Sequence, residues 1–205
     1  MGQAAPKKDF LAPRASSAQK VILLGDLGAP VHQPVGKTSL RRRWAGGDFP
    51  FTADVMEADL AIVRVELKPK PKQDATLTIF DTAGLERWGR FRSACHPGYF
   101  RRAAGVFVVF DVTCRQSFQH VQHWMYEVDS AVPFCHRVLL GNKADLQNHV
   151  VSEEEAQELA EAYGMTYLAT SAKSERNLSE ALYAMACRLP APESERLPCC
   201  AAAKG

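Results

Sequence analysis

The feature that most restricts the fold of this chain is the alternation of short apolar runs with longer segments of helical periodicity. The apolar runs predict six strands, at residues 21–24, 61–67, 75–80, 106–110, 138–140 and 165–168. Helical patterns lie between them, at residues 37–44, 117–128, 152–163 and 177–189. Strands that alternate with helices form a doubly wound α/β sheet, so we expect a mostly parallel, six-stranded sheet flanked by about five helices.

The chain of 205 residues suits one domain with a tail at each end. Residues 1–19 are rich in Ala, Ser, Pro and Lys and lack periodicity, which predicts a disordered tail. Residues 20–190 carry the strand and helix patterns, and the Lys- and Pro-rich stretch 68–72 within them predicts a hairpin loop. We expect residues 191–205, which contain the two adjacent cysteines Cys199 and Cys200, to form a short flexible tail.

Composition excludes several classes of function. A formal net charge of +2 lacks the basic excess of a nucleic-acid-binding protein. No apolar run reaches the roughly 18 residues of a transmembrane helix, and the first residues lack the apolar core of a secretory signal. The cysteines outside the C-terminal pair are scattered singly, as reduced thiols are in a cytosolic protein. We expect a monomer in the cytoplasm or on the cytosolic face of an endomembrane.

An interrupted phosphate-binding loop follows the first strand. Such a loop wraps an anion with backbone N–H groups, and it uses a Lys for the outer phosphates and a Ser or Thr hydroxyl for Mg²⁺. The candidate nucleotide-binding residues here are Gly28, Val35, Gly36, Lys37, Thr38 and Ser39, of which Thr38 is also a candidate Mg²⁺ ligand. The motif has four residues between its first Gly and the Gly-Lys pair, whereas Gly25 and Gly36 have ten between them. Removal of residues 29–34 restores the motif.

A second phosphate motif follows the third strand, where Asp81 begins the sequence Asp-Thr-Ala-Gly. A carboxylate at a strand end suits the coordination shell of Mg²⁺, and the following Gly84 lets a backbone N–H approach a γ-phosphate. Ligands of doubly wound sheets bind beyond the carboxyl ends of the strands. We therefore expect Asp81 and Gly84 to face the same ligand as the loop after the first strand.

Two further motifs suit a guanine base, and they follow the last two strands. An Asp carboxylate accepts two hydrogen bonds, which the N1–H and exocyclic amine of guanine supply and adenine does not. Backbone N–H groups of the second motif can meet the guanine O6. The candidate base-binding residues are Asn142, Lys143 and Asp145 in the first motif and Ser171, Ala172 and Lys173 in the second.

Together these motifs resemble those of the small GTPases of the Ras superfamily, over residues 20–189. Several stretches are similar to the Rab branch in particular: 77–88 (LTIFDTAGLERW), 99–105 (YFRRAAG), 108–113 (VVFDVT), Ser117-Phe118 and Trp124. The resemblance implies a P-loop GTPase domain that binds GTP or GDP with Mg²⁺. It also implies two switch loops that effector proteins read. Phe49 matches the family aromatic that packs on the guanine edge, and the alternative is a plain core phenylalanine.

The sequence departs from the family pattern around the phosphates. The insert 29–34 lengthens the phosphate loop, and Leu85, beside Gly84 at the catalytic position, replaces the Gln that orients the attacking water. Val55 stands where the family has a Thr ligand for Mg²⁺, and Thr52 substitutes for it only if the loop moves. Leu has no donor or acceptor with which to hold water, so these departures predict slow hydrolysis.

Three interpretations follow from this mixture of intact and altered motifs. The first is a Rab-like GTP/GDP switch in vesicle and membrane trafficking that hydrolyses GTP slowly, with effectors, an exchange factor and an activating protein as partners. The second is a pseudo-GTPase, a binding scaffold whose nucleotide affinity the insert weakens. In the third, the insert is an artefact of gene prediction and the protein has an ordinary loop.

The paired cysteines of the C-terminal tail resemble the double prenylation site of Rab proteins. Two lipid chains anchor a protein stably to a membrane, whereas one binds marginally. Residues 201–205 follow Cys199 and Cys200, which is a longer extension than usual Rab endings have. Both a prenylated pair and an unmodified pair are therefore compatible with the sequence.

Overall fold

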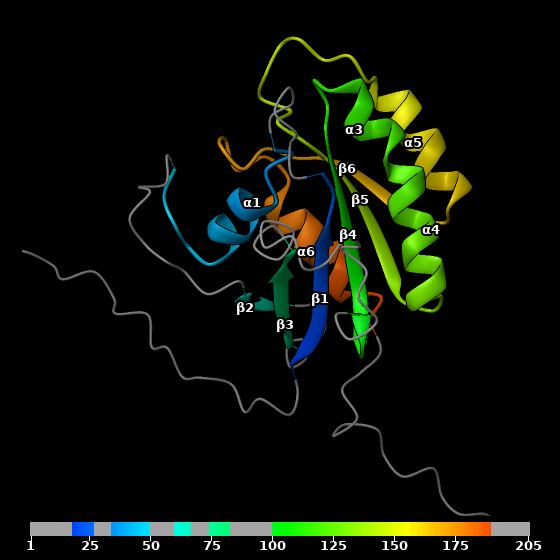
Figure 1. Cartoon of the computed structure of the whole chain (residues 1–205). Helices are drawn as coiled ribbons and strands as arrows, with labels where there is room; N and C mark the ends of the chain where they lie inside the picture. The colour runs from blue at the N-terminus through cyan, green and yellow to red at the C-terminus, as the bar shows by residue number, and fades with distance from the viewer. Residues whose placement is uncertain (1–17, 27–33, 50–59, 67–73, 83–99, 190–205) are drawn as a thin grey trace, which may run out of the picture.

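The computed structural model describes residues 18–26, 34–49, 60–66, 74–82 and 100–189. Six strands form one sheet in the order β2-β3-β1-β4-β5-β6 (Figure 1). The strands are β1 Gln19–Leu24, β2 Leu60–Glu66, β3 Asp74–Asp81, β4 Ala103–Asp111, β5 His136–Asn142 and β6 Thr166–Ala169. β2 pairs antiparallel with β3, and every other neighbouring pair is parallel. The predicted α/β fold with a mostly parallel six-stranded sheet is confirmed.

Helices cover both faces of the sheet (Figure 1). They are α1 Lys37–Trp44, α3 Arg115–Gln119, α4 Val121–Ala131, α5 Glu153–Ala162 and α6 Leu178–Ala186. Successive residues of a strand point to opposite faces of the sheet. Val21 and Leu23 of β1 therefore join the core beneath α1 and α6, whereas Ile22 and Leu24 join the core beneath α4 and α5.

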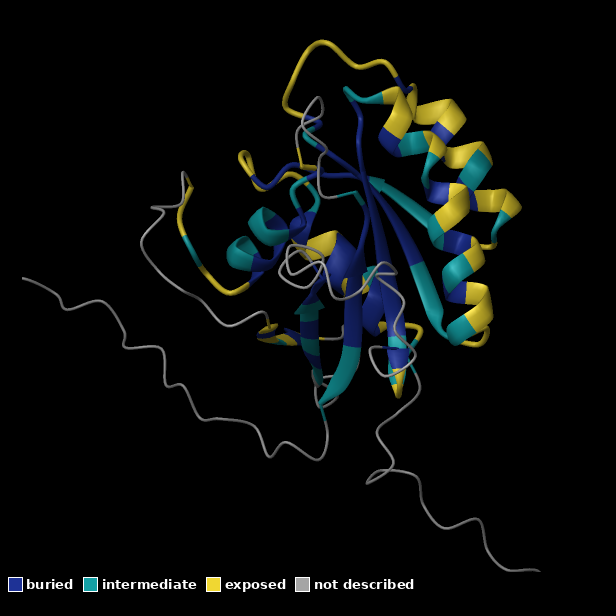
Figure 2. Ribbon diagram, viewed as in Figure 1, coloured by how far each residue is buried: buried dark blue, intermediate teal, exposed yellow. Residues whose placement is uncertain are grey.

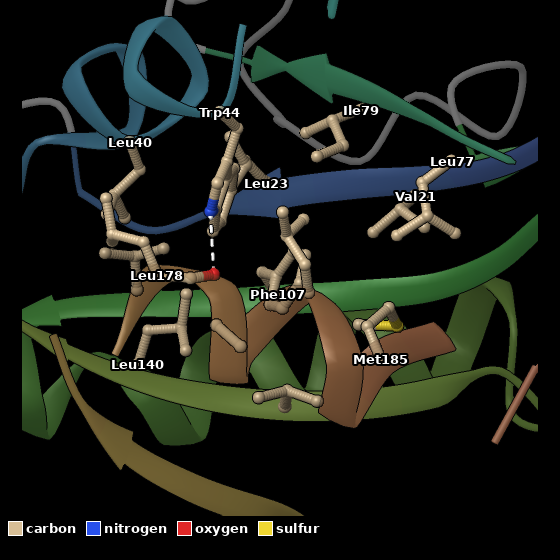
Figure 3. Packing of buried hydrophobic residues seen from close by; sticks show 14 of the residues in the cluster. Val21, Leu23, Leu40, Trp44, Leu77, Ile79, Phe107, Leu140, Leu178 and Met185 are labelled. Carbon is tan, nitrogen blue, oxygen red and sulfur yellow. Dashed lines mark hydrogen bonds between the residues drawn. The ribbon is translucent and has the colours of Figure 1, made fainter. Parts of the chain in front are cut away.

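The core beneath α1 and α6 is closed by Trp44, the last residue of α1 (Figure 3). Its ring centroid lies 5.1 Å from that of Phe107 on β4. Its Nε1 donates a hydrogen bond of 3.0 Å to the backbone oxygen of Leu178, the first residue of α6. A buried indole N–H requires such a partner, and this one fixes α1 against α6.

The helical pattern at 117–128 predicts one helix, but the chain forms α3 and α4 with His120 between them. Contacts outside the helix hold both sides of this interruption. The hydroxyl of Ser117 accepts a hydrogen bond of 3.0 Å from the backbone N–H of Asp111, and His120 Nδ1 lies 2.7 Å from Asp26 Oδ2. These contacts connect Ser117 and His120 to the loops at the carboxyl edge of the sheet. The single predicted helix is interrupted at His120, between α3 and α4.

The start of α5 follows the sequence prediction. The Ser152 hydroxyl accepts a hydrogen bond of 3.1 Å from the backbone N–H of Glu155, whose carboxylate accepts one of 3.2 Å from the backbone N–H of Ser152. This capping box satisfies two N–H groups that a helix N-terminus otherwise leaves without partners.

The sheet is buried over most of its length, whereas α4 and α5 turn exposed sides to solvent (Figure 2). The carboxyl ends of β1, β3, β4, β5 and β6 lie at one edge of the sheet, because these strands run parallel. Within the described residues, none of the helices has the length and apolar character needed to span a bilayer.

Candidate nucleotide site

The loop after β1 brings its first and last residues close together although residues 27–33 between them are not described. The backbone N–H of Val35 donates a long hydrogen bond of 3.5 Å to the oxygen of Asp26. Gly36 has φ +95°, a left-handed conformation that favours glycine, and it directly precedes α1. A Cβ at Gly36 would lie 2.4 Å from Nδ2 of Asn142. The loop therefore approaches β5 so closely that only glycine fits at position 36.

Lys37 begins α1 with its side chain turned back into this loop. The residue is 2% exposed, and its ammonium donates to the backbone oxygens of Gly25 and, over 3.3 Å, Asp26. A buried ammonium held by carbonyl groups at a helix N-terminus can exchange one of these acceptors for a phosphate oxygen. Thr38 and Ser39 follow in the first turn and are half-buried.

The side chain of Asp26 is held by α4 and the residue before it. His120 Nδ1 lies 2.7 Å from Asp26 Oδ2, and Trp124 Nε1 donates a hydrogen bond of 3.1 Å to Asp26 Oδ1. The sequence predicts neither contact, because Trp124 enters only through the resemblance to the Rab branch. His120 and Trp124 lie 94 and 98 residues beyond Asp26 in the sequence, so no local pattern connects them.

Asn142, the last residue of β5, connects the phosphate loop with the segment after β6. Its Nδ2 donates a hydrogen bond of 2.8 Å to the backbone oxygen of Val35, and its Oδ1 accepts one of 3.3 Å from the backbone N–H of Ala172. Asn142 is 2% exposed. Both halves of its amide are therefore used to set the distance between two of the predicted motifs.

The two predicted base motifs meet through Asp145 and Ser171. The hydroxyl of Ser171 donates a hydrogen bond of 2.7 Å to Asp145 Oδ1 and accepts others from the backbone N–H groups of Lys173 and Ser174, over 3.2 and 3.0 Å. The Lys173 ammonium lies 3.9 Å from Asp145 Oδ2. The Asp145 side chain is 17% exposed, so its carboxylate is oriented by the protein and still reaches solvent.

Arg43 of α1 also holds the segment after β6, a role that the sequence did not predict. Its guanidinium donates to the backbone oxygens of Ala172, Lys173 and Gly47, over 2.9, 3.2 and 3.2 Å. It also lies 2.8 Å from a carboxylate oxygen of Glu175. The fork of donors on an arginine suits such multiple carbonyl contacts. The helix that starts at the phosphate loop thereby also supports the base motif.

Lys143 pairs with the end of β4. It has φ +66°, and its ammonium lies 2.7 Å from Oδ2 of Asp111, a carboxylate that is 4% exposed. Asp111 also accepts hydrogen bonds from the backbone N–H and hydroxyl of Thr113, over 2.9 and 2.7 Å. The Lys143 side chain therefore runs across the carboxyl edge of the sheet between β4 and β5.

The two candidate Mg²⁺ ligands come from adjacent elements. Asp81 ends β3 and is 3% exposed, and Thr38 lies in the first turn of α1. A hydroxyl and a carboxylate are hard oxygen donors, so their chemistry fits Mg²⁺ completed by phosphate oxygens and water. Beside them, Arg41 Nε lies 3.6 Å from Asp81 Oδ2. No cluster of three or more His, Cys, Asp or Glu suited to a metal occurs within the described residues.

Several predicted residues lie outside the described part of the chain: Gly28, Thr52, Val55, Gly84, Leu85, Cys199 and Cys200. Their assignments stay predictions. Phe49 lies within the described residues and is 41% exposed. The interpretation of Phe49 as a plain core residue is therefore wrong.

Comparison with known proteins agrees with this geometry. The Ras family profile matches residues 20–190. Human Ras-related protein Rab-30 is 38% identical over 173 residues, which cover 83% of this chain and 79% of that protein. Bovine Rab-13 is 36% identical over 82% of this chain and 77% of its own length, and Rab-1D of Dictyostelium discoideum is 36% identical over 86% and 81%. The chain therefore belongs to the Ras family, as a Rab-like small GTPase of that superfamily.

Proposed function

We propose that this protein is a GTP/GDP-binding switch that acts in vesicle and membrane trafficking and hydrolyses GTP slowly. Family membership supports nucleotide binding, because Ras-superfamily proteins of the Rab type generally bind GTP or GDP with Mg²⁺. Effector proteins, an exchange factor and an activating protein are the partners that such a switch requires. The trafficking role rests on the similarity to proteins named Rab.

The observation that carries the proposal is the contact between Asp145 and the Ser171–Lys173 segment, after the ends of β5 and β6. Asp145 is held by Ser171 over 2.7 Å and can accept hydrogen bonds from the N1–H and amine of guanine. The backbone N–H of Lys173 lies in the same turn. Asn142 fixes this segment against Val35, so base and phosphate groups of one nucleotide face one edge of the sheet.

Mg²⁺, when bound with the nucleotide, neutralises phosphate charge. Thr38 and Asp81 would hold it, and the ammonium of Lys37 would meet the outer phosphates. Leu85 provides no group to orient a water, which supports slow turnover. The pseudo-GTPase alternative draws support from Lys37, whose ammonium already binds the carbonyl groups of its own loop, and from the ion pair between Arg41 and Asp81.

Titration with fluorescent GDP, followed by competition with GTP and ATP, tests the proposal. We expect GTP to compete and ATP to fail. In the Asp145→Asn variant, loss of the charged acceptor lowers GDP affinity by roughly 10- to 100-fold and raises affinity for xanthosine diphosphate, whose C2 oxygen accepts from the new amide. The Asp129→Asn variant on α4 removes a carboxylate far from the site and serves as the matched control.

Equal competition by ATP contradicts the base assignment. Absence of measurable GDP binding by the wild-type chain favours the pseudo-GTPase.

Membrane attachment is a separate part of the proposal, and it rests on Cys199 and Cys200. Intact mass after incubation with Rab prenylation enzymes is expected to rise by two prenyl groups, and an unchanged mass removes the anchor.

A further inference from the structure

Arg41 is a buried cation beside the carboxylate that the proposed site offers to Mg²⁺. Its Nε lies 3.6 Å from Asp81 Oδ2, and the two side chains are 5% and 4% exposed. Neither the phosphate motif nor the base motifs include this arginine. Charged side chains at such burial require a compensating charge, and here the chain supplies it itself.

The position of Arg41 follows from the helix that starts in the phosphate loop. Residues three and four apart on a helix share one face. Arg41 lies four residues after Lys37 and three after Thr38, and so belongs to the face of α1 that begins at the phosphate loop. The neighbouring arginines of the same turn differ: Arg43 reaches the segment after β6, and Arg42 is half-buried on another side.

A fixed guanidinium at this distance changes what a bound metal contributes. Mg²⁺ would bind oxygen atoms at the Asp81 carboxylate, and Arg41 lowers the negative charge that attracts the cation there. At the same time, Arg41 supplies permanent positive charge near the phosphates, which acts over several ångströms in a protein interior. Both effects reduce the difference between the metal-loaded and metal-free states of the site.

We propose that Arg41 acts as a built-in countercharge for Asp81, so that nucleotide retention by this chain depends only weakly on Mg²⁺. The inference rests on the proposed function, since it concerns how that site holds its nucleotide. Arg41 is a positioning residue in this view: it acts on the nucleotide through Asp81 and through charge, and takes no part in a reaction step.

The test compares the dissociation rate of fluorescent GDP in excess EDTA with that in saturating Mg²⁺, and the ratio of the two rates is the measured quantity. We expect the ratio to rise about tenfold in Arg41→Leu and in Arg41→Gln, because in both variants the negative charge of Asp81 is no longer compensated by Arg41 and attracts Mg²⁺ more strongly. Arg41→Lys retains the charge and keeps the ratio near that of the wild type. Arg42→Leu removes an arginine from the adjacent position of α1 and leaves the ratio unchanged.

A second measurement uses Mg²⁺ alone and the nucleotide-free protein. We expect Mg²⁺ to raise the melting temperature of Arg41→Leu or Arg41→Gln and to leave that of the wild type nearly unchanged. Equal responses of wild type and neutral variants to Mg²⁺, in either measurement, overturn the inference. Failure of the proposed function is distinguishable, because it appears as absence of GDP binding by the wild type while the response to Mg²⁺ alone still reports on Arg41.

Discussion

The base side and the phosphate side of the proposed site are built in different ways. On the base side, Asn142 and Asp145 are both hydrogen-bonded to the segment after β6, over 3.3 Å to Ala172 and 2.7 Å to Ser171. Arg43 of α1 also donates to this segment. On the phosphate side, Lys37 binds the carbonyl groups of its own loop and Asp81 is paired with Arg41. The family resemblance predicts that the sequence departures at 29–34, Val55 and Leu85 all fall on the phosphate side.

Under the proposed function, this difference predicts that recognition of the base and chemistry at the phosphates are separable in this fold. The base side carries the residue types predicted to bind guanine, whereas Leu85 and Val55 stand on the phosphate side where the family resemblance predicts Gln and Thr. Such a protein can keep its selectivity for guanine nucleotides while its rate of GTP hydrolysis falls. Asn142 is the group through which the two sides meet, because its amide binds Val35 and Ala172 at once.

The largest effect is expected where the two sides meet, in the Gly36→Ala variant. A Cβ there would lie 2.4 Å from Asn142 Nδ2, and the residue has φ +95°. We expect GDP affinity to fall by about 100-fold or more, since relief of the clash displaces either the loop or the Asn142 amide, and the backbone strain of about 1–3 kcal/mol lies within the site itself. Fluorescent GDP titration measures the loss.

The matched control is Gly46→Ala. Gly46 has a comparable φ of +86°, but its Cβ would meet nothing within 4 Å. The control therefore carries backbone strain without the clash, and it should lower thermal stability while GDP affinity stays near that of the wild type. If Gly36→Ala and the wild type bind GDP with similar affinity, the close contact between the loop and Asn142 does not contribute to nucleotide binding.

The second effect concerns the phosphate side alone. We expect Leu85→Gln to accelerate single-turnover phosphate release from GTP-loaded protein by about tenfold, the rate equivalent of one water-orienting hydrogen bond of about 1.4 kcal/mol. GDP affinity should stay unchanged. Val150→Gln, which places the same side chain at an exposed apolar position away from the site, controls for the substitution itself. Equal release rates for the wild type and Leu85→Gln contradict slow hydrolysis through loss of the Gln.

A smaller effect is expected on the base side, from Ser171→Ala. The variant removes the hydroxyl that donates to Asp145 and accepts from the N–H groups of Lys173 and Ser174. We expect GDP affinity to fall by about fivefold to tenfold, since a single hydrogen bond contributes about 1 kcal/mol. Ser174→Ala in the same turn is the control. An unchanged affinity for Ser171→Ala shows that Asp145 needs no support from the neighbouring loop.

The smallest effect lies at the other end of β5, away from the site. Burial, together with the charge of Arg188, lowers the pKa of His136 below its ordinary value of 6.5. The unfolded chain then takes up a proton before the folded chain does, so His136 makes stability fall as the pH drops below neutrality. Within the described residues, His136 Nε2 is buried without a hydrogen-bond partner.

We expect the melting temperature to fall between pH 7 and pH 5 by about a degree or two more in the wild type than in His136→Gln. The exposed His149→Gln variant should retain the loss seen in the wild type. Identical pH profiles for the wild type and His136→Gln would leave acid sensitivity to other groups.

Much of the fold could be predicted from the sequence because its signals are local. The bounds of α1 match the prediction, since Gly36 precedes its first residue in a left-handed conformation and glycines follow its last. The capping box of Ser152 and Glu155 set the start of α5. Apolar runs identified every strand but not its bounds. β4 begins at Ala103, before the run 106–110, and includes Asp111 after it, because pairing with the neighbouring strands continues beyond the apolar residues.

The supports of the site could not be predicted in the same way. Asp26 and His120 lie 94 residues apart, and Arg43 and Lys173 lie 130 apart, so no periodicity joins either pair. Three consecutive arginines in α1 are typical of a solvated basic turn, yet Arg41 is buried against Asp81. Its spacing from Lys37 and Thr38 is the signal that identifies the face to which it belongs.

The hydrogen bond between Asp26 and Val35 has a consequence for how this loop tolerates change. Its two ends are held independently, Asp26 by His120 and Trp124, and Val35 by Asn142. Chain length between two fixed points contributes little to the free energy, since each doubling of a loop costs only about 0.6 kcal/mol. We therefore expect the chain between Asp26 and Val35 to accept an inserted reporter peptide beside the proposed phosphate site, with Gly36 and Lys37 left in place.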